Sequence, residues 1–373
     1  MWRELEVQAD AAARAGDVAA ARALLEQAAT EARGAPFWLK LAGVRRAGGD
    51  LAAAVSAVKI ALEAEPLNPL ALLLHASLLE AQRDPAAGEA YGRALAQFPA
   101  DPPSQLRPVV ERARASWRRW QEGERDRLRA SVHPMAPLTP AIDRFITNAV
   151  RLTAPEREGP THYSFPGLDT HAWWPREHFP WLARLEAATD AIAAEFERAV
   201  AARPLLVPYV RYPAGVPLDQ WAALNGNRDW TALHLLDRGR RIAENADACP
   251  HTLAVLADVP QPDVAGAGPN AMFSLLAPRT HIPPHTGVAN TRLVCHLPLV
   301  VPEGCWFRVG EETRRWRRGE AFVFDDTVEH EAMNPTDELR VVLIFDIWHP
   351  GLTPEERAAV RAVIGGGGTL HRL

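Results

Sequence analysis

The chain has 373 residues, which is enough for two domains with separate hydrophobic cores. A hydrophobic fraction of 47% is typical of a globular protein, and a formal net charge of -5 gives no reason to expect nucleic acid or an anionic membrane as a partner. Three cysteines without CxxC spacing argue against a disulfide framework and a zinc ribbon. A charged N-terminus and the lack of a long apolar run predict a soluble, cytoplasmic protein with no membrane segment.

The first third of the chain is rich in helix-forming residues and contains a repeat. The dipeptides Gly16-Asp17, Gly49-Asp50 and Arg83-Asp84 place aspartates 33 and 34 residues apart, and each is followed by a run of small residues. This period is typical of tetratricopeptide helical hairpins. We therefore predict a tetratricopeptide-like helical repeat domain over residues 1–130, with a plain helical bundle as the alternative.

The next segments change in composition. Prolines 134, 137 and 140 predict a linker over residues 131–160. Residues 161–373 begin with a helical pattern at 179–200 and end with one at 353–363. Between them lie short strand-like runs at 271–276, 291–299, 305–309, 321–324 and 339–347. The predicted fold class is thus α + β multidomain, with a C-terminal jelly roll and flanking helices.

Two histidines and one arginine in this β-rich half suggest chemistry. His285 and His330 are 45 residues apart, a separation that can bring two strand ends to one mouth of a jelly roll, and imidazole suits ferrous iron with open positions. Arg340 begins an apolar strand, where its charge needs a carboxylate, and a bound dicarboxylate would supply one. Taken singly, each residue is more often structural. Gly287 stands where the usual two-histidine, one-carboxylate triad has its acid, so the pattern is one ligand short.

A series of short motifs follows in order from Tyr163 to the end. They are Phe165-Pro166-Gly167-Leu168, Trp173-Trp174, Gly239-Arg240-Arg241, Phe273-Ser274-Leu275-Leu276, His281-Ile282-Pro283-Pro284-His285-Thr286-Gly287, Asn290-Thr291-Arg292-Leu293, Phe324-Asp325-Asp326, Glu329-His330-Glu331 and Asp346-Ile347-Trp348-His349-Pro350. In this order they resemble the aspartyl/asparaginyl β-hydroxylases, some of which also carry an N-terminal tetratricopeptide region.

The resemblance implies a double-stranded β-helix and a dioxygenase that uses Fe(II) and 2-oxoglutarate. It implies that His285 and His330 bind the iron and that water replaces the missing carboxylate. It also implies that Ser274 and Arg340 bind the distal carboxylate of 2-oxoglutarate, with His296 near its other end. Trp230 would form a wall of that pocket, and Arg292 would face the carboxylate or amide of the substrate.

Two positions depart from the family pattern. Val294 stands where animal members have a second arginine, and Arg279 stands where the family often has glycine. The expected reaction is hydroxylation of the β-carbon of Asp or Asn in a peptide or protein, which the helical repeats would help to recruit. The alternatives are hydroxylation of an acyl chain or another small molecule, and a repeat scaffold without catalysis.

Overall fold

The computed structural model describes residues 2–31, 34–154, 159–201, 206–213 and 218–366. Contacts within the chain divide it into two compact units. The first comprises Met1–Gly123 with Pro213–Pro217, and the second comprises Glu124–Tyr212 with Leu218–Leu373.

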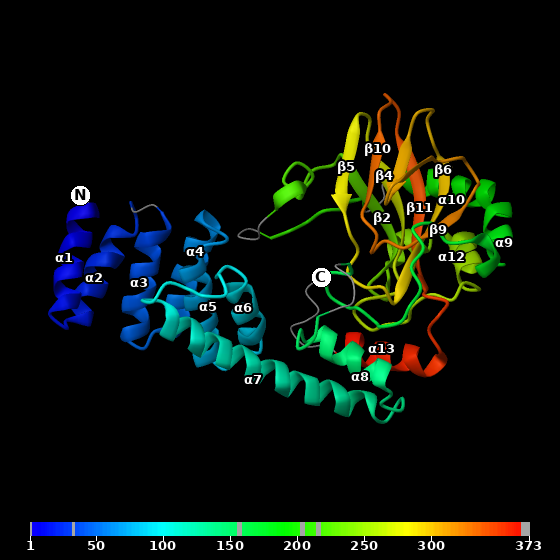
Figure 1. Ribbon diagram of the computed structural model, residues 1–373. Helices are drawn as coiled ribbons and strands as arrows, with labels where there is room; N and C mark the ends of the chain where they lie inside the picture. The colour runs from blue at the N-terminus through cyan, green and yellow to red at the C-terminus, as the bar shows by residue number, and fades with distance from the viewer. Residues whose placement is uncertain (1, 32–33, 155–158, 202–205, 214–217, 367–373) are drawn as a thin grey trace. The chain divides into compact units, whose positions relative to one another are not determined.

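The first unit is an array of helices that pack in sequential pairs (Figure 1). The pairs are α1 (Trp2–Arg14) with α2 (Val18–Ala28), α3 (Ala35–Ala47) with α4 (Leu51–Ala64), and α5 (Pro69–Ala81) with α6 (Ala87–Leu95). Helix α7 (Arg107–Val132) follows and begins in this unit.

The repeated dipeptides form the turns inside these pairs. Gly16 and Gly49 have φ values of 83° and 81°, which glycine adopts without strain, and Arg83 takes the third position with φ 58°. The next residue caps the following helix: Asp17 accepts a hydrogen bond from the amide of Ala20, and Asp50 from that of Ala53. Each helical hairpin needs one such turn. The turn residue and the capping aspartate therefore recur once per hairpin, every 33 or 34 residues. The structure agrees with the predicted tetratricopeptide-like helices.

Helix α7 packs closely against α6 through two glycines. A Cβ added to Gly88 would overlap the indole ring of Trp120, and one added to Gly92 would lie 3.1 Å from Trp117. Tryptophan rings therefore occupy the space that side chains on this face of α6 would need.

Gly88→Ala should lower the free energy of unfolding by about 1–3 kcal/mol, because the ring of Trp120 must shift in a packed interface. Gly43→Ala in α3 is the matched control. Nothing lies within 4 Å of its added Cβ, so the variant should gain roughly 0.5–1 kcal/mol of helix propensity. Chemical denaturation measures both, and equal effects would contradict the packing of α6 on α7.

The segment expected as a linker, residues 131–160, contains the helix α8 (Pro140–Ala149). Pro140 takes the first helical position, where a missing N–H costs nothing, and Thr139 caps the helix. Ile142, Phe145 and Ile146 are buried. The prolines therefore mark a helix start in this packed segment, whereas we had interpreted them as linker composition.

The second unit is built on two antiparallel sheets, as predicted for a double-stranded β-helix (Figure 1). The larger sheet has the order β1-β2-β4-β11-β6-β9, with β3 paired to β2, and the smaller has the order β5-β10-β7-β8. The strands are β1 (Val207–Pro208), β2 (Trp230–Asp237), β3 (Arg240–Arg241), β4 (Ala271–Leu276), β5 (Thr280–His285), β6 (Arg292–Val300), β7 (Trp306–Val309), β8 (Glu312–Arg315), β9 (Phe322–Phe324), β10 (His330–Asn334) and β11 (Arg340–Trp348). The helices of this part are η1 (Arg176–His178), α9 (Leu182–Ala187), α10 (Thr189–Ala201), η2 (Asp219–Trp221), α11 (Ala243–Ala246), α12 (Pro250–Leu256) and α13 (Pro354–Gly365).

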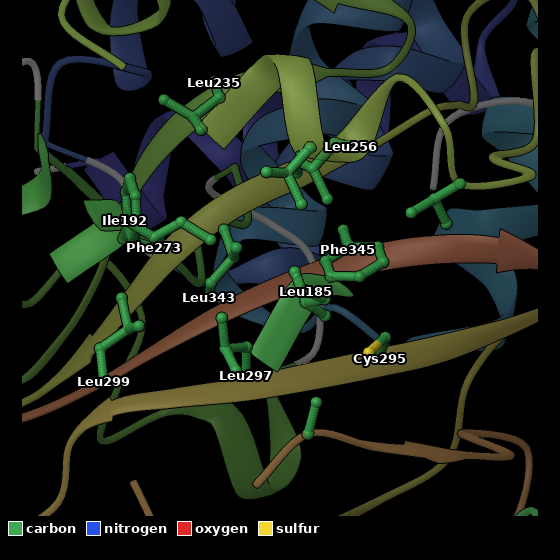
Figure 2. Close-up of a cluster of buried hydrophobic side chains, with 14 of the residues drawn as sticks. Leu185, Ile192, Leu235, Leu256, Phe273, Cys295, Leu297, Leu299, Leu343 and Phe345 are labelled. Atoms are coloured by element: carbon green, nitrogen blue, oxygen red, sulfur yellow. The ribbon is translucent and has the colours of Figure 1, made fainter. Parts of the chain in front are cut away.

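The larger sheet is buried on both faces. On its outer face, Phe273, Leu297 and Leu343 belong to one apolar core with residues of α9, α10 and α12 (Figure 2). On its inner face, Val294 and Val342 share a second core with residues of the smaller sheet. Strand residues alternate between the two faces, and this alternation decides which side chains enter the space between the sheets. Among the described helices, none combines the length and apolarity that crossing a bilayer requires.

Candidate active site

His285 and His330 lie side by side on neighbouring strands of the smaller sheet. They are paired in the register of β5 and β10, and their ring centroids are 4.0 Å apart. His330 is 7% exposed and shares its face of β10 with the buried Ala332. Two imidazoles 45 residues apart in sequence therefore meet at one point inside the barrel.

A bulge in β5 turns His285 toward the interior. Ile282 pairs with Ala332 and points into the barrel core, so strict alternation would direct His285 outward. The register shifts between these two pairs, which inserts one residue at Pro283-Pro284. Such an extra residue changes the phase of a strand and re-aims the next side chain. Proline is tolerated there because a bulged residue does not need to donate to the ladder.

Each of the two histidine rings is held through its Nδ1 atom. Nδ1 of His285 lies 2.7 Å from the carbonyl of Pro283, and Nδ1 of His330 lies 2.9 Å from the carbonyl of Val328. A carbonyl only accepts, so each Nδ1 carries the proton and each Nε2 keeps its lone pair. Burial, with repulsion from His330, lowers the pKa of His285 to about 3, and burial lowers that of His330 to about 4. Both rings are neutral, as metal ligands must be.

Arg340, Ser274 and Trp230 come together on the inner face of the larger sheet. The Arg340 guanidinium donates to the carbonyl and the hydroxyl of Ser274, each at 3.3 Å, and Trp230 Nε1 donates to the same hydroxyl at 3.0 Å. Because the hydroxyl oxygen already accepts twice, its own hydrogen is available to donate to a ligand.

The Arg340 side chain is fully buried, yet no carboxylate within the described residues forms an ion pair with it. Its Nε has no hydrogen-bond partner there, and burial lowers the pKa of the guanidinium to about 10. The cation lies over the ring of Trp316 at 4.8 Å. An unpaired buried cation is costly, so the arrangement fits an anionic ligand better than it fits the protein alone.

His296 lies further along the same interior. Trp316 Nε1 donates to His296 Nδ1 at 3.4 Å, which leaves the proton of the neutral ring on Nε2 as a donor. Burial and the nearby Arg340 hold the pKa of His296 well below its ordinary value. Phe307 and Phe324 pack against the ring, with centroids 5.0 Å away in both cases.

Arg292 is held by two aspartates at the start of β6. Its Nη2 lies 3.0 Å from Asp326 and its Nη1 3.1 Å from Asp346, and both carboxylates are at most 9% exposed. Burial alone would lower the pKa of Arg292, but the two carboxylates raise it. Burial raises the pKa of Asp326. The guanidinium predicted to face a substrate is thus already paired within the protein.

Asp326 also fills the space beside Gly287. A Cβ at Gly287 would overlap the carboxylate of Asp326, whose Oδ1 is buried without a hydrogen-bond partner. Within the described residues, no group of three His, Cys, Asp or Glu side chains gathers as a metal cluster would. Asp325 instead accepts hydrogen bonds from the amide and the hydroxyl of Thr327, which form a turn before His330.

The side chains of Arg279 and His281 point away from the interior. Arg279 has φ 57°, a conformation that favours glycine, and its exposed side chain pairs with Asp337 at 2.8 Å. His281 lies on the outer face of β5 and contacts Glu331 at 2.7 Å. Neither side chain contributes to the histidine pair.

The structure brings six of the seven predicted site residues to one interior, and the seventh, Arg292, lies at its edge in the ion pairs described above. The six are His285, His330, Ser274, His296, Arg340 and Trp230. Their individual roles stay predictions. Sequence analysis missed Trp316, which is 5% exposed although it stands in the basic run at residues 314–318. A single tryptophan between arginines was the sequence signal that could have indicated a buried position.

A family model described as aspartyl/asparaginyl beta-hydroxylase matches residues 187–350, which include the histidine pair and Arg340. The C-terminal part of this chain is similar to that family over these residues. The match covers the two sheets from β1 to β11 and ends at Pro350.

Several relatives in the family align with this same part. The chain is 37% identical over 150 residues to the human aspartyl/asparaginyl beta-hydroxylase, which is 40% of this chain and 20% of that protein. It is 35% identical over 179 residues to the ornithine lipid ester-linked acyl 2-hydroxylase of Rhizobium tropici, which is 47% of this chain and 60% of that protein. A solved cupin barrel protein from Salinispora arenicola has a TM-score of 0.22 and 13% identity, over 36% of this chain and 87% of that one. The chain thus spans only a fifth of the human relative's length and three fifths of the Rhizobium relative's.

If His285 and His330 bind Fe(II), as the resemblance to the family implies, Gly287→Ala should lower that affinity by ~10–100-fold, because disturbing the residues that hold a metal ligand in place commonly has an effect of this size. The added methyl group would displace the Asp326 carboxylate from Arg292 and disturb the loop before His330. Anaerobic titration measures the affinity. The double variant Gly287→Ala/Asp326→Ala removes the overlap and should recover part of the Fe(II) affinity that the single variant loses. Wild-type affinity in the single variant would contradict the close packing of Asp326 on Gly287.

Proposed function

We propose that the C-terminal part is an Fe(II)- and 2-oxoglutarate-dependent hydroxylase acting on the β-carbon of Asp or Asn residues in a peptide or protein. The observation that carries the proposal is the presence, in one interior, of two inward, neutral imidazoles and a buried guanidinium that has no carboxylate partner among the described residues. The match to the family model supports the same chemistry.

The residues present fit the proposed groups. His285 and His330 each offer a free Nε2 and would hold the iron. Arg340 and the Ser274 hydroxyl would bind the distal carboxylate of 2-oxoglutarate through charge-assisted hydrogen bonds. His296 would donate its Nε2 proton toward the other end of the cosubstrate. When bound, iron and 2-oxoglutarate supply the activation of dioxygen.

The chain itself contributes orientation and exclusion of water. Trp230 fixes the Ser274 hydroxyl, so the donor points in one direction before the cosubstrate arrives. Phe307, Phe324 and Trp316 surround His296 with apolar surface. Exclusion of water would strengthen the ion pair of Arg340 with its ligand and protect a reactive oxidant from side reactions.

We further propose that the substrate is a peptide recruited with the help of the N-terminal helices, because helical repeats commonly bind extended peptides. An acyl chain is the second candidate. The similarity to the Rhizobium acyl 2-hydroxylase and the apolar Val294 at an interior position favour it.

The test is an anaerobic Fe(II) titration of the full chain, followed by succinate release from 2-oxoglutarate in air. Peptides with a central Asp or Asn should stimulate succinate release and gain the mass of one oxygen atom. Absence of iron binding and turnover would favour a scaffold without catalysis. Stimulation by fatty acyl compounds, with unmodified peptides, would favour the acyl hydroxylase.

A further inference from the structure

Trp316 is buried inside the barrel although it stands in an exposed basic run. It is 5% exposed, whereas Arg315 and Arg317 on either side of it are exposed. Its ring stacks on that of Phe307, with centroids 5.4 Å apart and an interplanar angle of 21°. Trp316 therefore enters the inner apolar core from the position just after β8.

The face of the Trp316 ring supports the charge of Arg340. The central carbon of the guanidinium lies 4.8 Å from the ring centroid, which is within the range of cation–π contacts. Such contacts are stronger away from water, and the Arg340 side chain is fully buried. Because no carboxylate among the described residues pairs with Arg340, the ring stabilises a charge that would otherwise be costly to bury.

A ring face stabilises a guanidinium without using its hydrogen-bond donors. A carboxylate partner commonly takes two N–H groups of an arginine in a bidentate pair, whereas an aromatic ring contacts the guanidinium plane from one side. In Arg340, Nη1 donates to Ser274, and Nε has no partner among the described residues. The contact with Trp316 therefore holds the cation in place and leaves donors available to an incoming anion.

The indole N–H of Trp316 acts on a second polar group. It donates to Nδ1 of His296 at 3.4 Å, and the two ring centroids are 6.2 Å apart at an interplanar angle of 25°. A donor at Nδ1 places the proton of the neutral imidazole on Nε2. One side chain thus holds a buried cation with its face and orients a neutral imidazole with its edge.

We propose that Trp316 is a positioning residue for the anion that binds at Arg340. Its ring face holds the guanidinium in place of a carboxylate, and its N–H group fixes His296 as a donor. The need for an anion follows from the buried, unpaired guanidinium, and only the identity of that anion as 2-oxoglutarate rests on the function proposed above. The ligand would meet a charge and a donor already in position, so little side-chain ordering would oppose its binding.

A double-mutant cycle on the metal-free full chain tests the contact between the ring and the cation. Trp316→Leu removes the ring, Arg340→Met removes the charge, and chemical denaturation in a buffer without phosphate or carboxylate measures unfolding. The change in the unfolding equilibrium constant caused by Trp316→Leu should be roughly 2–30-fold smaller in the Arg340→Met background, as expected for a cation–π contact. The packing that Trp316→Leu loses is common to both backgrounds and cancels. Equal changes in the two backgrounds overturn the contact.

Anaerobic calorimetric titration of the full chain with 2-oxoglutarate, with Fe(II) present, tests the positioning. Trp316→Phe keeps a ring face but lacks the N–H group, so the Kd should rise by ~2–10-fold, the effect of one lost hydrogen bond. Trp316→Leu loses both contacts, and its Kd should rise by at least ~10-fold. Trp306→Leu is the matched control, because Trp306 packs near His281 on the outer face of the same sheet, and its Kd should not change.

The outcomes separate this inference from the proposed function. If Trp316→Leu is unfolded, Trp316→Phe decides the matter. A Kd that Trp316→Phe and Trp316→Leu leave unchanged overturns the positioning role but not the hydroxylase. A wild-type chain that binds no 2-oxoglutarate overturns the proposed cosubstrate, and the double-mutant cycle then still decides whether Trp316 holds Arg340.

Discussion

His330→Ala is expected to abolish succinate release from 2-oxoglutarate and to weaken Fe(II) binding by more than ~100-fold, beyond the loss seen for outer-shell changes. The variant removes one of two imidazoles that offer a free Nε2, and within the described residues no third His, Cys, Asp or Glu side chain gathers with them to replace it. Anaerobic titration and a succinate assay measure the two effects separately.

His281→Ala is the matched control for that variant. His281 lies in the same sheet, but its side chain is 44% exposed and contacts Glu331 on the outer face. Iron binding should therefore stay as in the wild type. If His330→Ala retained turnover, or His281→Ala lost it, the assignment of the iron ligands would be wrong.

Arg340→Met is expected to separate stability from function. The substitution removes a buried cation that has no carboxylate partner among the described residues and leaves a side chain of similar length, so the protein without cosubstrate should unfold at an equal or higher temperature. Binding of 2-oxoglutarate should weaken by about 2–5 kcal/mol, or at least ~30-fold, because the charged partner of its carboxylate is lost.

Thermal unfolding with and without 2-oxoglutarate measures both consequences of Arg340→Met. The wild type should gain stability on adding the cosubstrate, and the variant should not. Arg279→Met is the control, since this exposed arginine forms a surface ion pair with Asp337 and its loss should change stability by about 0–1 kcal/mol. A variant at Arg340 that binds 2-oxoglutarate normally would refute its role.

Local sequence patterns predicted much of the fold. Turn glycines and capping aspartates at a period of 33 and 34 residues indicated the helical pairs, and apolar runs at 271–276 and 339–347 matched β4 and β11. These strands are buried on both faces, so they read as continuous apolar segments. Strands β5 and β10 were missed because their sequences contain prolines or polar site residues and carry little of the usual strand pattern.

The amino-acid sequence by itself determined which groups are available. They are the histidines 285 and 330, an arginine on an apolar strand, and Ser274 and His296 within apolar strand-like runs. Their resemblance to a family supplied the expected roles. These features are local or lie within single strands, so periodicity and composition reveal them.

Only the tertiary structure decided how those groups meet. The bulge at Pro283-Pro284, the placement of Trp316 under Arg340, and the neutralisation of Arg292 by Asp326 and Asp346 all depend on strand register. Register joins residues far apart in the chain and is set by the packing of whole sheets, which no short stretch of sequence encodes.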